Sequence, residues 1–306
     1  MGRYGCLSGS GRHVYKPVFE QKENKREKKE EMKRVFSIVL MLVSTVTLIY
    51  GTHYLHQCLE EKQQMLGAVE RLKTVGQSKP QGTYRKVKQE NAGSKNAIEQ
   101  ERDVAQQTCH PVPVNLGEIE KQNSRVIAWI EIPDTPVSYP VVQGEDNSYY
   151  LTHTFEGEES LYGSIFLDCE NDSSFADSHS VVYGHNMQDG VMFAFLNQYG
   201  QQKVMQEHPY IYVYTEKKAF VYRIFSVYQA TIGDVSYEIG LPLGSLQYEN
   251  QLEQLVALSE YETGTLVDAK RPFLTLITCN GQLSDSQRTA VHAILEEEFE
   301  KITKLS

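Results

Sequence analysis

Three side chains in the second half of the sequence have the types that thiol-based acyl transfer requires, namely His185, Cys279 and Arg288. The thiolate is the attacking form of cysteine, so a neighbouring imidazole or cation must take its proton or favour the charged sulfur. Attack on an amide creates an oxyanion, which a guanidinium can hydrogen-bond because it is always charged. The imidazole can then protonate the departing amine. Together the three residues would supply a nucleophile, an acid/base and an oxyanion stabiliser.

Each of these residues lies at the end of an apolar run that favours a β-strand. The run FLTLITC ends at Cys279, a polar connection follows over residues 280–287, and RTAVHAIL begins at Arg288. Two runs joined by so short a connection most simply pair as an antiparallel hairpin. The run SVVYGH ends at His185, and turn-prone residues follow it. We therefore expect the three side chains at one rim of a sheet, although spacing alone does not single them out among nine His and five Cys residues.

The region from Thr108 to Ser306 holds five further runs of this kind, VIAWIEI, VSYPVV, GSIFLD, YIYVY and FVYRIFSVYQA. Tyr, Val, Ile and Phe dominate the runs, and many are too short for helices. The pattern therefore predicts an all-β barrel or sandwich.

Three helices can be placed between these runs. Asn115 can cap a short helix that ends before Gln122, and Asp189 can start another. The third precedes the strand that ends at Cys279, and its apolar face has helical spacing. The residues of that face are Tyr248, Leu252, Leu255 and Val256.

The cysteine pattern argues against a disulfide framework and against a zinc ribbon. The five cysteines are an odd number without CxxC spacing: Cys6, Cys58, Cys109, Cys169 and Cys279. At least one thiol should stay free. The first four are expected to be small buried or simply exposed side chains. We predict no metal site and no cofactor.

The charge is distributed unevenly along the chain. Residues 1–107 contain 19 Lys and Arg against 12 Asp and Glu, whereas residues 108–306 contain 11 against 28. A domain this acidic would repel phosphate backbones, so nucleic-acid binding is not expected.

The N-terminal part predicts a membrane anchor. Residues 35–51, VFSIVLMLVSTVTLIYG, have no charged side chain and come directly after the basic stretch 22–34. Their length is near the short limit of about 17 to 25 residues for a bilayer span. The basic flank predicts a cytoplasmic N-terminal segment, residues 1–34, and export of the chain beyond the span. A cleaved signal peptide is disfavoured, because no A-x-A site comes after the apolar run.

A linker is expected between the anchor and the folded domain, over residues 52–107. The spacing of Leu55, Leu59, Leu66, Val69 and Leu72 predicts a helix, and the sequence then becomes polar. The polar stretch should act as a tether that keeps residues 108–306, the expected catalytic domain, near the membrane.

Several of these motifs, taken in order, resemble the sortase family. They are VIAWIEIPDTPVSYPVVQGEDNSYYL, YGSIFLDCEN, VVYGHNM, and LTLITC followed by Arg288, and they cover roughly residues 116–295. The helix and the SEYETGTLV run before LTLITC resemble the class B subgroup. Two positions depart from that subgroup, with Ile277 in place of a common Ser and Asn280 in place of a frequent acidic residue. These departures concern substrate contact and leave the three site residues unchanged.

The resemblance implies a closed eight-stranded β-barrel with added helices. It also implies a membrane-bound cysteine transpeptidase that cleaves the C-terminal sorting motif of exported proteins and holds the acyl part as a thioester on Cys279. The acyl group would pass to an amine of a peptidoglycan precursor or, in pilus-building members, to a pilin lysine. In the family pattern His185 is the catalytic His and Arg288 the catalytic Arg.

Two other functional classes can be weighed against this one. A papain-like hydrolase would also use Cys and His, but its cysteine precedes its histidine, whereas here His185 comes first. A membrane-tethered binding domain with an inert Cys279 is the second alternative, and a thiol reagent would distinguish it.

Other candidate side chains have simpler interpretations. We expect His292 to be a structural strand residue, His153 and His179 to lie on the surface or in loops, and Asp285 to be a solvated turn residue. The acidic run 296–300 should be a solvated face.

Overall fold

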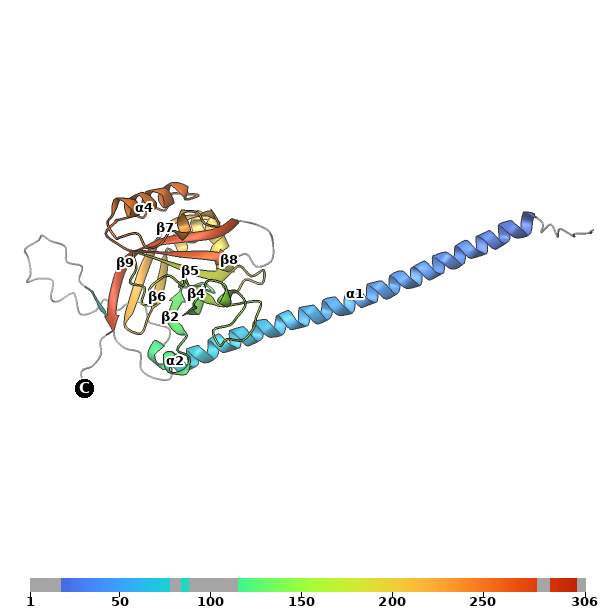
Figure 1. Ribbon diagram of the computed structural model, residues 1–306, viewed down its shortest axis with the longest axis horizontal. Helices are drawn as coiled ribbons and strands as arrows, with labels where there is room; N and C mark the ends of the chain where they lie inside the picture. The colour runs from blue at the N-terminus through green and yellow to red at the C-terminus, as the bar shows by residue number, and fades with distance from the viewer. Residues whose placement is uncertain (1–17, 78–83, 88–114, 280–286, 302–306) are drawn as a thin grey trace, which may run out of the picture. The chain divides into compact units, whose positions relative to one another are not determined.

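The computed structural model describes residues 18–77, 84–87, 115–279 and 287–301 (Figure 1). The chain divides into two compact units, residues 1–60 and 61–306. Helix α1 (Val18–Gln77) crosses that boundary, so its two parts are described separately.

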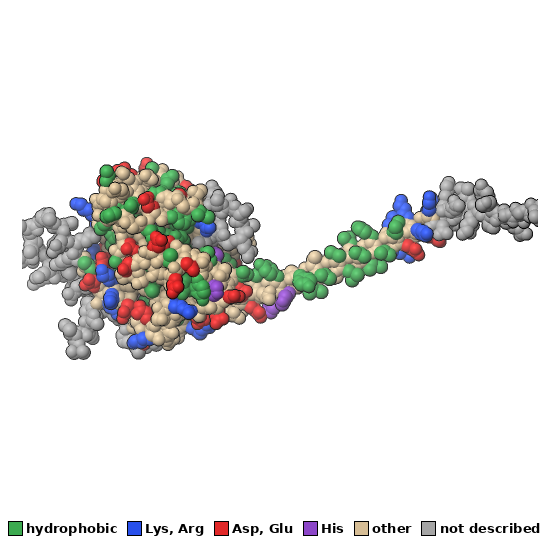
Figure 2. Space-filling view, in the orientation of Figure 1, with side chains coloured by type: hydrophobic (Ala, Val, Ile, Leu, Met, Phe, Trp, Pro, Cys, Tyr) green, Lys and Arg blue, Asp and Glu red, His purple; other side chains and the backbone are tan. Residues whose placement is uncertain are grey.

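In the first unit, α1 is a continuous helix with exposed apolar side chains over residues 35–50. Figure 2 shows these side chains as a green stretch, with basic groups gathered toward the N-terminal end of the helix. A helix rises about 1.5 Å per residue, so the uncharged run can cover most of a hydrocarbon core of about 30 Å. Among the described residues, α1 is the helix that is long and apolar enough to cross a membrane.

The second unit is a closed β-barrel of eight strands, β2 to β9. Neighbouring strands follow the order β9-β7-β6-β2-β3-β4-β5-β8, and a further pairing of β8 with β9 closes the barrel (Figure 1). The strands are β2 (Val126–Glu131), β3 (Ser138–Gln143), β4 (Ile165–Leu167), β5 (His179–His185), β6 (Tyr210–Tyr214), β7 (Lys218–Thr231), β8 (Phe273–Cys279) and β9 (Gln287–Lys301). Each of the eight apolar runs overlaps one of them, and a barrel rather than a sandwich results.

Two pairings in the barrel are parallel, β3 with β4 and β5 with β8, and the other six are antiparallel. A short ninth strand, β1 (Tyr84–Lys86), pairs with β9 outside the closed ring. It lies within the segment that the sequence predicts to be a linker.

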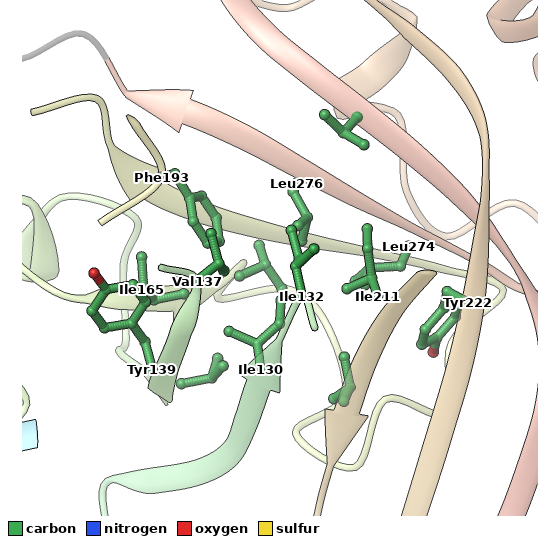
Figure 3. Close-up of a cluster of buried hydrophobic side chains, with 14 of the residues drawn as sticks. Ile130, Ile132, Val137, Tyr139, Ile165, Phe193, Ile211, Tyr222, Leu274 and Leu276 are labelled. Carbon is green, nitrogen blue, oxygen red and sulfur yellow. The ribbon is translucent and has the colours of Figure 1, made fainter. Parts of the chain in front are cut away.

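Alternating side chains of the strands fill the barrel interior. Figure 3 shows the labelled side chains converging between the strands, including Ile130, Ile165, Phe193 and Leu276, all of which are nearly fully buried. A Cβ placed on Gly184 would lie 2.4 Å from Ile165 Cδ1 and 2.7 Å from the Phe193 ring. Strand β5 therefore needs glycine at this position to let the core side chains approach it.

Along the sequence, the helices of the second unit that follow α1 come between the strands. They are α2 (Leu116–Gln122), η1 (Tyr149–Leu151), η2 (Ala194–Gly200), α3 (Gln202–Glu207), η3 (Val235–Tyr237) and α4 (Leu246–Leu258). Ser245 caps α4 by accepting a hydrogen bond from the Tyr248 amide, and α4 packs on β7. The N-cap residue of α2 is Asn115, as predicted, but its side chain makes no capping bond.

Two helix predictions are wrong in detail. The helix predicted to start at Asp189 is the 3-10 helix η2, which begins at Ala194 because Asp189 belongs to a turn after β5. On α4, Val256 is 44% exposed, and Gln251 joins Tyr248, Leu252 and Leu255 on the buried face.

The last part of α1 packs within the second unit. Met65, Ala68, Val69 and Leu72 are buried, and their i, i+3, i+4, i+7 spacing puts them on one helix face. Leu66, on another face, stays 39% exposed.

Candidate active site

Strand register brings the predicted site residues into one cross-strand row. In the parallel pairing of β5 with β8, His185 lies opposite Cys279. The antiparallel pairing of β8 with β9 ends with Ile277 opposite Ala290. If this register is continued by two residues, Cys279 aligns with Arg288. The predicted hairpin is thus confirmed. The backbones of His185, Cys279 and Arg288 follow one another across three adjacent strands.

The His185 ring is held by a backbone carbonyl. It is 7% exposed, and its Nε2 lies 2.6 Å from the carbonyl oxygen of Leu151 at the end of η1. A carbonyl only accepts, so Nε2 carries the proton, and in the neutral ring Nδ1 keeps the lone pair. The neutral ring can therefore accept a proton at Nδ1.

The position of that carbonyl depends on a glycine. Gly163 has φ +55°, and a Cβ there would lie 2.5 Å from the carbonyl oxygen of Tyr150 and 2.8 Å from that of Leu151. No other residue fits this left-handed position so close to two carbonyls. The chain can therefore turn tightly beside the group that orients His185.

The Arg288 guanidinium is anchored to the neighbouring strand. Arg288 is half-buried, and its Nη1 donates to the carbonyl oxygen of Thr278 at 3.3 Å. The backbone amide of Thr289 donates to Thr278 Oγ1 at 2.9 Å. Thr278 thus fixes the start of β9 against the end of β8, which holds a permanent positive charge near the end of β8.

Hydrogen bonds and an ion pair hold the turn after His185 at several points. The Phe193 amide donates to the His185 carbonyl at 2.9 Å. Asp189 Oδ2 accepts from the Tyr162 hydroxyl at 2.9 Å and lies 3.1 Å from Lys62 Nζ on α1. The end of α1 that belongs to the second unit is therefore bonded to the loop after the candidate acid/base.

The prediction that His179 lies on the surface or in a loop is wrong. It is a fully buried residue of β5, with Nδ1 2.7 Å from the Glu238 carbonyl and Nε2 2.7 Å from Thr275 Oγ1. Burial lowers the pKa of His179 to about 3. The residues before it, Asp177 and Ser178, resemble a turn in the sequence, which hides the start of the strand.

His292 is a structural residue, as predicted. It is fully buried, its Nδ1 lies 2.8 Å from Thr275 Oγ1, and its ring stacks on Tyr228. Burial, with the nearby His179, lowers the pKa of His292 well below its usual value. With both pKa values lowered, both rings are neutral at pH 7. His179 Nδ1 donates to the Glu238 carbonyl, so its Nε2 accepts from the Thr275 hydroxyl, and that hydroxyl oxygen accepts from His292 Nδ1.

The remaining candidates lie elsewhere or outside the described residues. Cys58 and Cys169 are partly exposed, and burial raises the pKa of the Cys169 thiol. His153 is partly exposed and stacks on Tyr149. Cys6, Cys109, Asn280 and Asp285 lie outside the described residues.

No metal-binding cluster of three or more His, Cys, Asp or Glu side chains occurs among the residues that the structure describes. The acidic run of β9 is partly paired rather than merely solvated, since Glu298 lies 2.6 Å from Lys218 and Glu297 pairs with Lys86.

Two parts of the site could not be identified from the sequence. The Leu151 carbonyl has no residue-type signal, because any residue offers the same backbone group. Asn197 on η2 bonds to both Asn186 and Thr289, and an exposed polar residue of a short helix has no periodicity to mark it. Only its capacity to form hydrogen bonds is visible in the sequence.

Comparisons with known proteins identify the family of this chain. The family model for the sortase domain matches residues 130–296. Sortase B of Listeria monocytogenes is 34% identical over 165 residues, which cover 54% of this chain and 67% of that protein.

Solved structures give the same result. Sortase B from B. anthracis in complex with AAEK1 superposes with a TM-score of 0.61 at 26% identity, covering 78% of this chain and 98% of that one. Staphylococcus aureus sortase B has been solved with a substrate, and a sortase B has been solved with triglycine, and each structure has a TM-score of 0.56 at 28% identity. Both alignments cover 61% of this chain, together with 85% of the chain in the substrate complex and 86% of the chain in the triglycine complex. With its family model, its barrel and its relatives in agreement, this chain belongs to the sortase family of transpeptidases and is class B-like.

Proposed function

We propose that this sortase cleaves a C-terminal sorting motif of exported proteins through a thioester on Cys279 and transfers the acyl group to an amine. The observation that carries the proposal is the cross-strand row, in which Cys279 pairs with His185 and aligns with Arg288 when the register of β8 and β9 is continued by two residues. A nucleophile, an acid/base and a fixed cation are then contributed by three adjacent strands.

The chemistry consists of two acyl transfers. The Cys279 thiolate attacks the scissile carbonyl carbon, and the Arg288 guanidinium hydrogen-bonds the resulting oxyanion. The oxyanion collapses, the C–N bond breaks, and protonated His185 gives its proton to the departing amine. A second amine then attacks the thioester, loses its proton to His185, and releases the thiolate.

The chemical class of the two substrates is argued from the relatives. Solved structures show S. aureus sortase B with a substrate and a sortase B with triglycine. Triglycine presents a free amine, so by analogy the acceptor here is an amine of a peptidoglycan precursor. A pilin lysine would offer the same nucleophile and is the alternative acceptor.

We also propose that α1 anchors the chain in the membrane, with the N-terminus in the cytoplasm and the catalytic domain outside. The uncharged run has basic residues on its N-terminal side, which favours retention of that side in the cytoplasm. A domain held near the membrane meets exported substrates at high local concentration.

The test uses the detergent-solubilised chain with a peptide library and an amine nucleophile. Cys279→Ala should abolish both cleavage and the covalent acyl-enzyme seen by mass spectrometry, and His185→Ala should abolish turnover. Cys58→Ala and Cys169→Ala are the matched thiol controls and should retain activity.

Arg288→Lys keeps the charge but loses the planar fork, so kcat/KM should fall by about 10² to 10³. Turnover in the Cys279→Ala variant would refute the mechanism. Near-normal turnover in folded Arg288→Lys would remove the assigned role of the guanidinium.

A further inference from the structure

A chain of side-chain hydrogen bonds runs from β7 through β9 and η2 to the residue after His185. Gln229 Nε2 donates to Thr289 Oγ1 at 3.2 Å, and the Thr289 hydroxyl donates to Asn197 Oδ1 at 2.6 Å. Asn197 Nδ2 then donates to Asn186 Oδ1 at 2.7 Å. In this series, Thr289 and Asn197 each accept a hydrogen bond from the preceding side chain and donate one to the next.

This series of hydrogen bonds links the two outer strands of the proposed catalytic row, β5 and β9. Asn186 directly follows His185, the last residue of β5, and Thr289 directly follows Arg288 on β9. Strands β5 and β9 are both neighbours of β8 and do not pair with each other in the described sheet. Asn197 therefore connects the residue after His185 to the residue after Arg288 through side-chain bonds that do not involve β8.

The described backbone pairing of β8 with β9 does not extend to Cys279 and Arg288. The described pairing of β8 with β9 runs from Phe273–Ile294 to Ile277–Ala290 and so ends before the row of Cys279 and Arg288. Beyond that point, side-chain bonds of Thr278 and Arg288 hold β9 in place. Thr289 is only 2% exposed, so its hydroxyl bond to Asn197 is largely shielded from water.

We propose that Asn197 is a positioning residue, which sets the distance between His185 and Arg288 without touching substrate. The inference rests on the proposed catalytic roles of these two residues. Misplacement of an acid/base or of an oxyanion donor by a fraction of an ångström weakens bonds that matter most in the transition state. Loss of Asn197 should therefore lower kcat and leave KM nearly unchanged.

The test compares substitutions that remove or keep the bonds. Asn197→Ala should lower kcat about five- to thirtyfold, as expected from loss of two neutral hydrogen bonds. Thr289→Val removes the hydroxyl at constant shape and should reproduce that loss, whereas Thr289→Ser keeps the hydroxyl and should restore most of the rate. Gln198→Ala, at the exposed neighbouring position of η2, is the matched control and should be unaffected.

A structural role alone would give a different pattern. It would lower the melting temperature of Asn197→Ala while the folded fraction kept a normal kcat, and that outcome would overturn the inference. Equal rates for Thr289→Val and Thr289→Ser would do the same, even if Asn197→Ala fails to fold. His185→Ala and Cys279→Ala are assayed in parallel, because turnover in either would reject the proposed function itself, independently of Asn197.

Discussion

Two histidines of β5 show how position within one strand decides what a side chain can do. His185, at the C-terminal end, is oriented by the Leu151 carbonyl and keeps a lone pair on Nδ1. His179, at the N-terminal end, is fully buried, and both of its nitrogens are occupied by Glu238 and Thr275. The first can accept a proton at Nδ1, as its proposed role requires, and the second is fixed in the neutral form.

The buried pair of His179 and His292 should make folding sensitive to acid. Both pKa values are lowered in the folded state, so below pH 6.5 the unfolded chain binds more protons than the folded one. Stability present at neutral pH is therefore lost as the pH falls below about 6.5, by about 1.4 kcal/mol per pH unit for each ring. For His179 this window extends down to about pH 3.

His292→Asn removes one of these rings while keeping a donor toward Thr275. The variant should be less stable at pH 7, but its stability should decline less steeply as the pH falls below about 6.5, because one ring that gains a proton on unfolding is absent. Urea unfolding at several pH values measures both quantities. Identical slopes in the variant and the parent chain would show that His292 is protonated as easily when folded as when unfolded.

At the scale of elements, the end of α1 is part of the folded domain. Its buried face over residues 65–72 packs within the second unit, and Lys73 lies 5.9 Å from the Trp129 ring centroid. The same helix contributes Lys62 to the loop after His185. The part of α1 that belongs to the second unit therefore helps to hold the loop after His185.

Two leucines of α1 provide a matched test of this packing. Leu72→Ala should destabilise the chain by about 2–4 kcal/mol, because it leaves a cavity at a side chain that is 7% exposed. Leu66→Ala, at a side chain that is 39% exposed, should cost no more than about 0.5 kcal/mol. Denaturant unfolding compares the two, and equal losses would contradict the packing.

The strands were more predictable from sequence than their partners. All eight apolar runs become strands, and the hairpin of β8 and β9 is expected from its short connection. The parallel pairing of β5 with β8 joins distant segments, and no local pattern encodes such a contact. His185 could therefore be placed at a strand end from its sequence, but its position opposite Cys279 required the fold or the family resemblance.

At the scale of the whole molecule, the basic segment, the uncharged apolar segment and the acidic domain follow one another along the chain. The uncharged stretch of α1 comes after a basic segment, and the acidic domain comes after both. Protease added to cells whose wall has been removed should digest residues 61–306 while the membrane is intact. Protection until the membrane is lysed would reverse the proposed orientation, and a cytoplasmic marker protein controls for leakage.

The order in which the barrel closes also determines when the proposed catalytic row can form. Strand β9 comes last in the chain, and it is the strand that joins β7 to β8. Contacts between distant segments, such as that of β5 with β8, form slowly because a long loop must close first. A chain synthesised from its N-terminus therefore carries His185 long before Cys279 and Arg288 can lie beside it. The nascent protein should have no transpeptidase activity until its last strand has emerged.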